Sequence, residues 1–240
     1  MRLALALRLM ARETRGASGK ILFFTACLAV GVAAIVAVAG LSNGIDRGLR
    51  REARSLLAAD LSVRADKPFP AAVTQAVDAQ VAARPGARSV ALRELGTIVS
   101  IPGTGGVPGA SALVLLKAVG DGYPFYGSVA TSPAGQLPGL LDPEGVLVAP
   151  ELAGKLRLVE GSVLRIGGKD FVVRGRILSE PDKINVSFTL GPRVMLSLAG
   201  FERTGLEAFG SRVDRVILVR LGSGAVAADA FDFARGLERV

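Results

Sequence analysis

The sequence predicts an α+β protein in which a single N-terminal transmembrane helix and a helical stalk carry a two-subdomain α+β core outside the cytoplasm. Three observations support this prediction. Residues 21–41 form an apolar run without a charge, residues 42–59 separate apolar from basic side chains with helical spacing, and residues 60–240 change to short strand and helix patterns.

The basic charge of the chain flanks the apolar run instead of marking the folded domain. Residues 1–20 hold five basic side chains against one acidic, and residues 42–59 hold four against two. The remaining 181 residues are nearly balanced, with 20 basic against 18 acidic side chains. A nucleic-acid binder would concentrate Lys and Arg on its folded domain, beside aromatic platforms. We therefore expect no nucleic-acid partner.

The apolar run has the length of a membrane span. As a helix, its 21 residues would extend about 31 Å, against about 30 Å for the hydrocarbon core of a bilayer. An A-x-A tripeptide at residues 37–39 raises the alternative of a cleaved signal peptide, but signal h-regions are shorter, at about 7–15 residues. We favour an uncleaved anchor with a cytoplasmic N-terminus. Both alternatives place residues 60–240 outside the cytoplasm.

Both flanks of the span are predicted to be amphipathic helices. Residues 1–20 form a cytoplasmic segment whose basic face suits the anionic headgroups of membrane lipids. In residues 42–59 one face carries Ile45, Leu49 and Leu56, and the opposite face is basic. This stalk is either a basic helix resting near the membrane or a rigid lever packed against other helices, and the pattern leaves both open.

Residues 60–119 predict a strand–helix–strand–strand unit. The helix ends at a Pro-Gly pair, and a Pro- and Gly-rich loop at 102–109 separates the last two strands. The expected strands are 61–64, 90–101 and 112–119, and the expected helix is 71–84.

Residues 120–209 predict an inserted β-rich subdomain. A buried strand at 145–149 precedes a helix that begins at Pro150, and Gly167-Gly168 suits a two-residue hairpin turn between strands 162–166 and 169–177. A further strand is expected at 193–196.

Residues 210–240 predict a strand at 213–221 and a helix at 225–237. In residues 60–119 the comparable helix is followed by a strand, and here that strand is missing. We expect a fragment of a longer protein; the alternative is a native chain that ends on a docked helix.

The composition provides few groups for chemistry. The chain has no His and a single Cys, Cys27, so it lacks His-based acid–base catalysis, His-containing zinc sites and an intrachain disulfide. We predict no catalytic, cofactor-binding or metal-binding residues, and no cofactor. Lys117 is interpreted as an edge or snorkelling lysine in an apolar strand, and Glu180 and Asp182 as charged loop residues.

The order of the elements resembles the periplasmic core domain of MacB/LolC/FtsX-type ABC transporter permeases, and the local sequence is most similar to the YbbP-like branch. The similarity covers nearly the whole chain, although no single stretch is a chemically defined signature. The stretches that carry it are residues 5–13, 24–41, 51–61, 123–127, 146–152, 161–168 and 180–182.

The resemblance implies a non-catalytic permease subunit of an ABC-type export or mechanotransmission complex in the bacterial cytoplasmic (inner) membrane. It further implies a cytoplasmic ABC ATPase partner, a permease dimer partner and additional membrane helices, so that this chain is an N-terminal part. Residues 60–119 with 210–240 would then form the membrane-proximal subdomain, and 120–209 the inserted one. The competing function is a membrane-anchored extracytoplasmic interaction or sensor domain without an ATPase partner.

Overall fold

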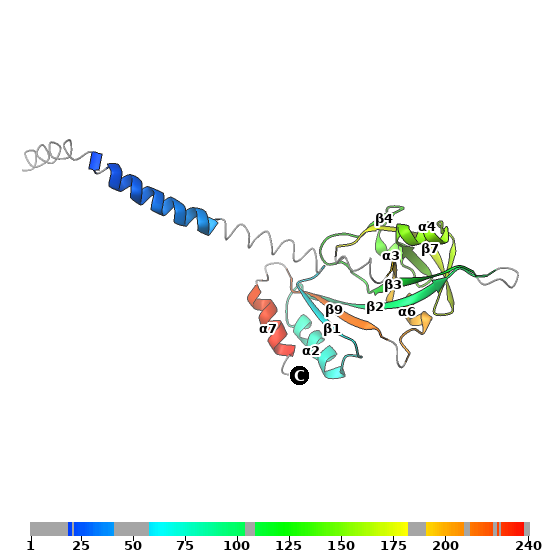
Figure 1. Ribbon diagram of the computed structural model, residues 1–240. Coiled ribbons are helices and arrows are strands. Elements are labelled where there is room, and N and C mark those ends of the chain that lie inside the picture. Colours follow the sequence, from blue (N-terminus) through cyan, green and yellow to red (C-terminus); the bar gives the residue numbers. More distant parts are fainter. Residues whose placement is uncertain are drawn as a thin grey trace, which may run out of the picture. The chain divides into compact units, whose positions relative to one another are not determined.

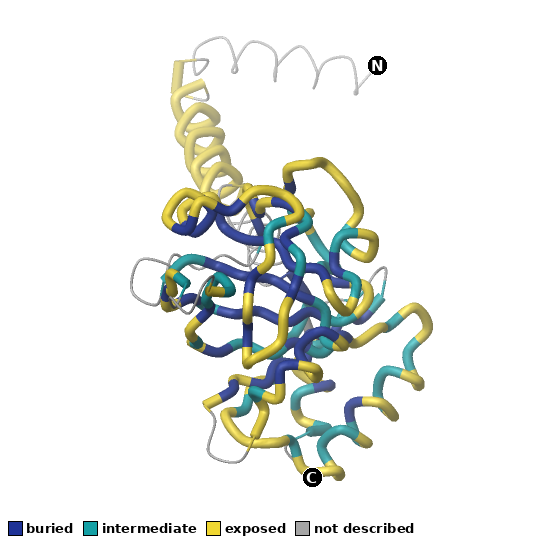
Figure 2. Tube along the Cα trace, turned by 90° about the vertical axis from the view of Figure 1, so that its right-hand side faces the viewer, coloured by how far each residue is buried: buried dark blue, intermediate teal, exposed yellow. Residues whose placement is uncertain are grey.

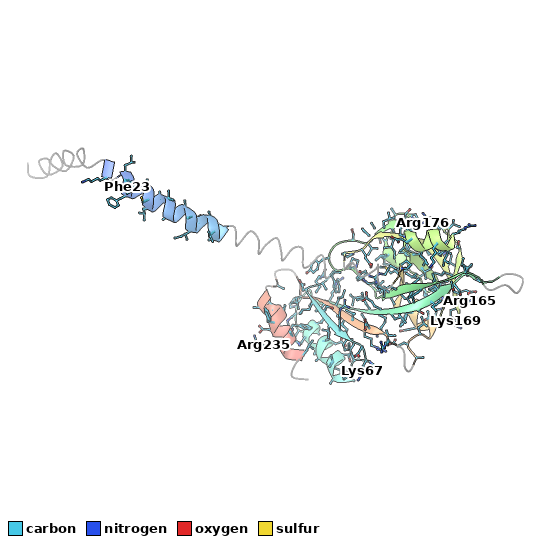
Figure 3. The ribbon with its side chains drawn as sticks, viewed as in Figure 1. Phe23, Lys67, Arg165, Lys169, Arg176 and Arg235 are labelled. Atoms are coloured by element: carbon cyan, nitrogen blue, oxygen red, sulfur yellow. The ribbon has the colours of Figure 1, made fainter. Side chains whose placement is uncertain are left out.

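The computed structural model describes residues 19–20, 22–40, 58–103, 109–181, 191–208, 212–222, 225 and 227–237, in two separate units that divide between Glu52 and Ala53 (Figure 1). In the first unit, one described helix, Leu22–Gly40, is long and apolar enough to cross a membrane, with a mean hydropathy of 2.6 and exposed side chains such as Phe23 (Figure 3). Residues 41–57, which carry most of the expected stalk, lie outside the described residues.

Nine strands in the described part of the outer domain form one mixed sheet, in the order β1-β9-β2-β3-β8-β5-β7-β4, with β6 paired to β2 and β7. The pairs β3–β8 and β5–β7 are parallel, and the other described pairs are antiparallel. The strands are β1 (Leu61–Ala65), β2 (Arg88–Ser100), β3 (Ser111–Val119), β4 (Ala130–Ser132), β5 (Gly145–Val148), β6 (Val163–Ile166), β7 (Lys169–Ser179), β8 (Arg193–Ser197) and β9 (Asp214–Arg220).

One face of the sheet is covered by helices. Alternate residues of a strand point to opposite faces, so Val114 and Leu116 of β3 reach the helix-covered face together. There they join a buried cluster that includes Leu152 and Phe201. The helices of the domain are α2 (Ala71–Ala82), α3 (Leu137–Leu140), α4 (Pro150–Leu156), α6 (Leu198–Thr204) and α7 (Ala227–Leu237), of which α2 and α7 pack together beneath β9 (Figure 1).

The opposite face is covered mainly by the segment between β3 and β5. Leu147, Met195 and Leu218 lie on this loop-covered face, in a buried cluster with Tyr123 and Leu141 of the covering segment. The central strands therefore have buried residues on both faces. Buried residues, dark blue in Figure 2, gather in the middle of the domain. Charged groups on this face must be paired within the protein, because water does not reach them.

The structure confirms the expected strands and the three expected helices of the outer domain, at 71–84, from Pro150 and at 225–237. The stalk helix at 42–59 and the amphipathic helix in residues 1–20 stay predictions. Gly167 and Gly168 have φ values of 57° and 78° and connect β6 to β7 with Ile166 paired to Lys169, the geometry of a type I′ turn. The short elements β4, α3 and α6 were not expected. Because β3 pairs with β8, one sheet joins residues 60–119 to residues 120–209, and the division into two subdomains stays a prediction.

The two turn glycines provide a matched test of this hairpin. Gly168→Ala is expected to cost about 1–2 kcal/mol of unfolding free energy, because a left-handed conformation is strained for alanine and nothing else lies near the new methyl group. Gly167→Ala adds a collision with the carbonyl oxygen of Thr204 and is expected to cost about 3 kcal/mol or more. Urea unfolding followed by circular dichroism measures both, and equal costs would contradict the observed packing of the turn on α6.

Candidate functional site

A buried lysine lies on the loop-covered face at the centre of the sheet. Lys117 belongs to β3, which has β2 on one side and β8 on the other, and its side chain is 0% exposed. Its ammonium nitrogen is 2.8 Å from the hydroxyl of Tyr123, 3.4 Å from Glu180 Oε2 and 3.8 Å from Glu94 Oε1. The same ammonium group lies 4.6 Å from the centre of the Tyr123 ring.

Arg193 of β8 completes the arrangement. Its Nε donates to Glu180 Oε1 at 2.8 Å, and its Nη1 is 3.5 Å from Glu94 Oε1. Each oxygen of the Glu180 carboxylate therefore has its own cationic partner, although the side chain is only 2% exposed. Glu94, Lys117, Tyr123, Glu180 and Arg193 are called the buried charge cluster below.

The structure corrects two interpretations from the sequence. Lys117 is not an edge or snorkelling lysine, because its strand is internal and its ammonium group is enclosed. Glu180 is not a solvated loop residue, because its carboxylate is buried between Lys117 and Arg193. Asp182 lies outside the described residues. The signal was present in β2, where Glu94 interrupts an apolar strand directly opposite Lys117, but only the register of the two strands reveals the pairing.

The buried charge cluster is better suited to fixing how the strands and segments around it pair than to adding stability. Removing two carboxylates and two cations from water costs several kcal/mol per ion, which their mutual attraction repays only with good geometry. The cluster joins β2, β3 and β8 to the residue that follows β7 and to the segment after β3. It therefore holds segments distant in sequence in one register.

A short segment connects the cluster to the place where the chain enters the domain. Residues 120–127, called the strap, follow β3 and contain Tyr123. The backbone N–H of Phe125 donates to the carbonyl of Ala58 at 3.1 Å, and the hydroxyl of Tyr126 donates to Asp60 Oδ2 at 2.8 Å. The strap therefore contacts both the buried charge cluster and residues 58–60.

Residues 58–60, called the junction, are held firmly to the domain. Ala58 and Ala59 are fully buried, and Ala58 has a φ of 54°, a conformation that a right-handed helix does not contain. Asp60 donates its N–H to the carbonyl of Val219 at 3.0 Å, and its Oδ2 accepts the N–H of Leu221 at 2.9 Å. The junction is thus bonded to both β9 and the strap.

Among the described residues, no group of three or more His, Cys, Asp or Glu side chains could hold a metal ion. A pocket of about 240 Å³, lined in part by Ser132, Glu160 and Arg176, is smaller than the roughly 300–1,000 Å³ of ligand sites. The absence of catalytic, cofactor and metal residues stays a prediction, and the described site is a set of internal contacts.

An apolar helix long enough to span a membrane precedes a mixed α+β sheet domain, and this is the architecture of a membrane-anchored domain. The chain belongs to the MacB-like periplasmic core domain family, whose model matches residues 22–233.

The similarity extends to individual proteins. The chain is 32% identical over 203 residues to the uncharacterized ABC transporter permease YbbP of Escherichia coli K12, a match that covers 84% of this chain and 23% of that permease. The chain thus spans about a quarter of the length of this relative. Two solved structures are also similar, each with 12% identity and a TM-score of 0.45: the periplasmic region of MacB from Actinobacillus actinomycetemcomitans, and the extracellular domain of the noncanonic ABC-type transporter YknZ from Gram-positive bacteria. The matches cover 68% and 69% of this chain, and 72% and 81% of those chains.

Proposed function

We propose that the chain is the N-terminal part of a permease subunit in an ABC-type export or mechanotransmission complex. The observation that carries the proposal is the family membership of residues 22–233, which include both the apolar helix and the outer domain. In this proposal the protein lies in the bacterial inner membrane with its N-terminus in the cytoplasm and its sheet domain in the periplasm. It hydrolyses no nucleotide, and a cytoplasmic ABC ATPase partner supplies the energy.

The internal site is consistent with a mechanical role. The junction is buried and hydrogen-bonded on two sides, so movement of the anchor relative to the domain would act on β9 and on the strap. Dimerisation with a second permease subunit and contact of residues 1–20 with membrane lipids belong to the same proposal.

The proposal is tested by purifying the protein that carries this chain from bacterial membranes and measuring ATP hydrolysis. We expect an ABC ATPase to co-purify at a fixed ratio, and hydrolysis to disappear when the P-loop lysine of that ATPase is replaced. Alkaline phosphatase fused after residue 240 of this chain should be active, which reports a periplasmic location. A chain that purifies without an ATPase from native membranes would instead support an anchored interaction or sensor domain.

A further inference from the structure

We propose that the strap, residues 120–127, is a mechanical link that couples the junction to Glu180 and Pro181, the two residues directly after β7. The strap is attached to the buried charge cluster at its far end. The inference rests on the proposed function, because that function supplies the anchor movement that the strap would transmit. Its physical content, a coupling between two ends of one segment, can be tested without any partner.

The junction end of the link consists of two bonds on adjacent residues. The backbone N–H of Phe125 donates to the carbonyl of Ala58, and the hydroxyl of Tyr126 donates to the carboxylate of Asp60. The same carboxylate oxygen accepts the N–H of Leu221, just beyond β9. A displacement of the junction therefore changes the geometry of strap and β9 contacts together.

The far end of the link reaches the residues that follow β7. The ammonium group of Lys117 donates hydrogen bonds to the hydroxyl of Tyr123 and to the carboxylate of Glu180. Gly127, with a φ of 76°, approaches Pro181 so closely that a Cβ atom at this position would lie 2.8 Å from the proline Cβ. The strap thus reaches Glu180 indirectly, through Lys117, and lies directly against Pro181 at Gly127.

Between its two ends the strap has little freedom to absorb movement. Its first residue, Gly120, donates its N–H to the carbonyl of Ala91 in β2 at 3.0 Å, and Tyr123 is buried. Only Pro124 separates Tyr123, bonded to the cluster, from Phe125, bonded to the junction. A segment this short, attached at every second or third residue, moves as a unit and passes displacement from one end to the other.

The coupling is tested by perturbing one end and measuring hydrogen exchange at the other, in the full chain reconstituted in lipid nanodiscs. Tyr126→Phe removes a junction bond, and the amides of residues 177–180 are then expected to exchange about fivefold faster or more. Glu180→Gln and Tyr123→Phe weaken the cluster end, and the amides of Asp60 and Leu221 are expected to accelerate similarly.

The control is Asp170→Asn, which weakens an exposed ion pair to Arg165 at the opposite end of the same strand β7 (Figure 3). This variant should leave the exchange rates of residues 177–180, Asp60 and Leu221 unchanged. Acceleration confined to the substituted end would overturn the link, and so would an equal acceleration of β3 amides such as Leu116, because that reports global opening. If Glu180→Gln fails to fold, the two tyrosine variants decide the question alone.

The experiment separates this inference from the proposed function. Hydrogen exchange in nanodiscs needs no ATPase, so uncoupled ends would overturn the link and leave the permease proposal standing. Coupled ends in a protein that purifies without an ATPase would leave the link intact within an anchored domain of another kind.

Discussion

Replacing Lys117 by Met is expected to lower the free energy of unfolding of the outer domain by about 3–5 kcal/mol, the range measured when one partner of a buried ion pair is removed. Methionine has a similar length, so the change removes charge and leaves little empty volume. The carboxylate of Glu180 then keeps Arg193 but loses the cation at its other oxygen, while remaining buried. Urea unfolding in detergent micelles, followed by far-UV circular dichroism, measures the loss.

Two further variants show whether the loss comes from the charge imbalance. Adding Glu180→Gln to Lys117→Met removes one charge of each sign and leaves Arg193 facing Glu94 at 3.5 Å. We therefore expect the double variant to lose clearly less than the sum of the two single variants. Arg165→Met, which breaks the half-exposed pair with Asp170, should change stability by less than about 1 kcal/mol. A loss of less than 1 kcal/mol for Lys117→Met would contradict the enclosed cluster.

This cluster marks the limit of what the sequence could predict about the site. The composition, with no His and a single Cys, directs attention away from His and Cys chemistry, and Lys117 is unusual within its apolar strand. Its environment depends on contacts between residues 63 positions apart in sequence, Lys117 and Glu180, and on the parallel pairing of β3 with β8. No local pattern encodes a parallel pairing across so long a connection, because each strand alone has the same alternation in any register.

The fold shows the same division between local and long-range information. Strand β2, helix α2 and the Gly167-Gly168 turn follow from periodicity and turn residues, which act over a few neighbouring positions. The elements β4 and α3 contain three and four residues, too few to show a period. Their position is decided by packing against β7 and β5 in the finished sheet.

Helix α7 also followed from the sequence, and its docking carries the second large prediction. Replacing Phe233 by Ala is expected to cost about 3–5 kcal/mol of unfolding free energy. The ring is fully buried against Val77 and Val219, and the guanidinium of Arg84 lies 5.2 Å from its centre. Truncation therefore removes packing from α2, α7 and β9 at once, and urea unfolding measures the result.

Phe231 provides the matched comparison, since it lies on the same helix two positions earlier and is 69% exposed. The two substitutions remove identical atoms and alter helix propensity equally, so their difference isolates burial. Phe231→Ala is expected to change the unfolding free energy by no more than about 0.5 kcal/mol. A loss at Phe233 as small as that expected at Phe231 would contradict the burial of the Phe233 ring. A large loss at Phe233 alone would establish that the last described helix is part of the core. It would also establish that this helix supports β9 and Leu221, which are hydrogen-bonded to Asp60 of the junction.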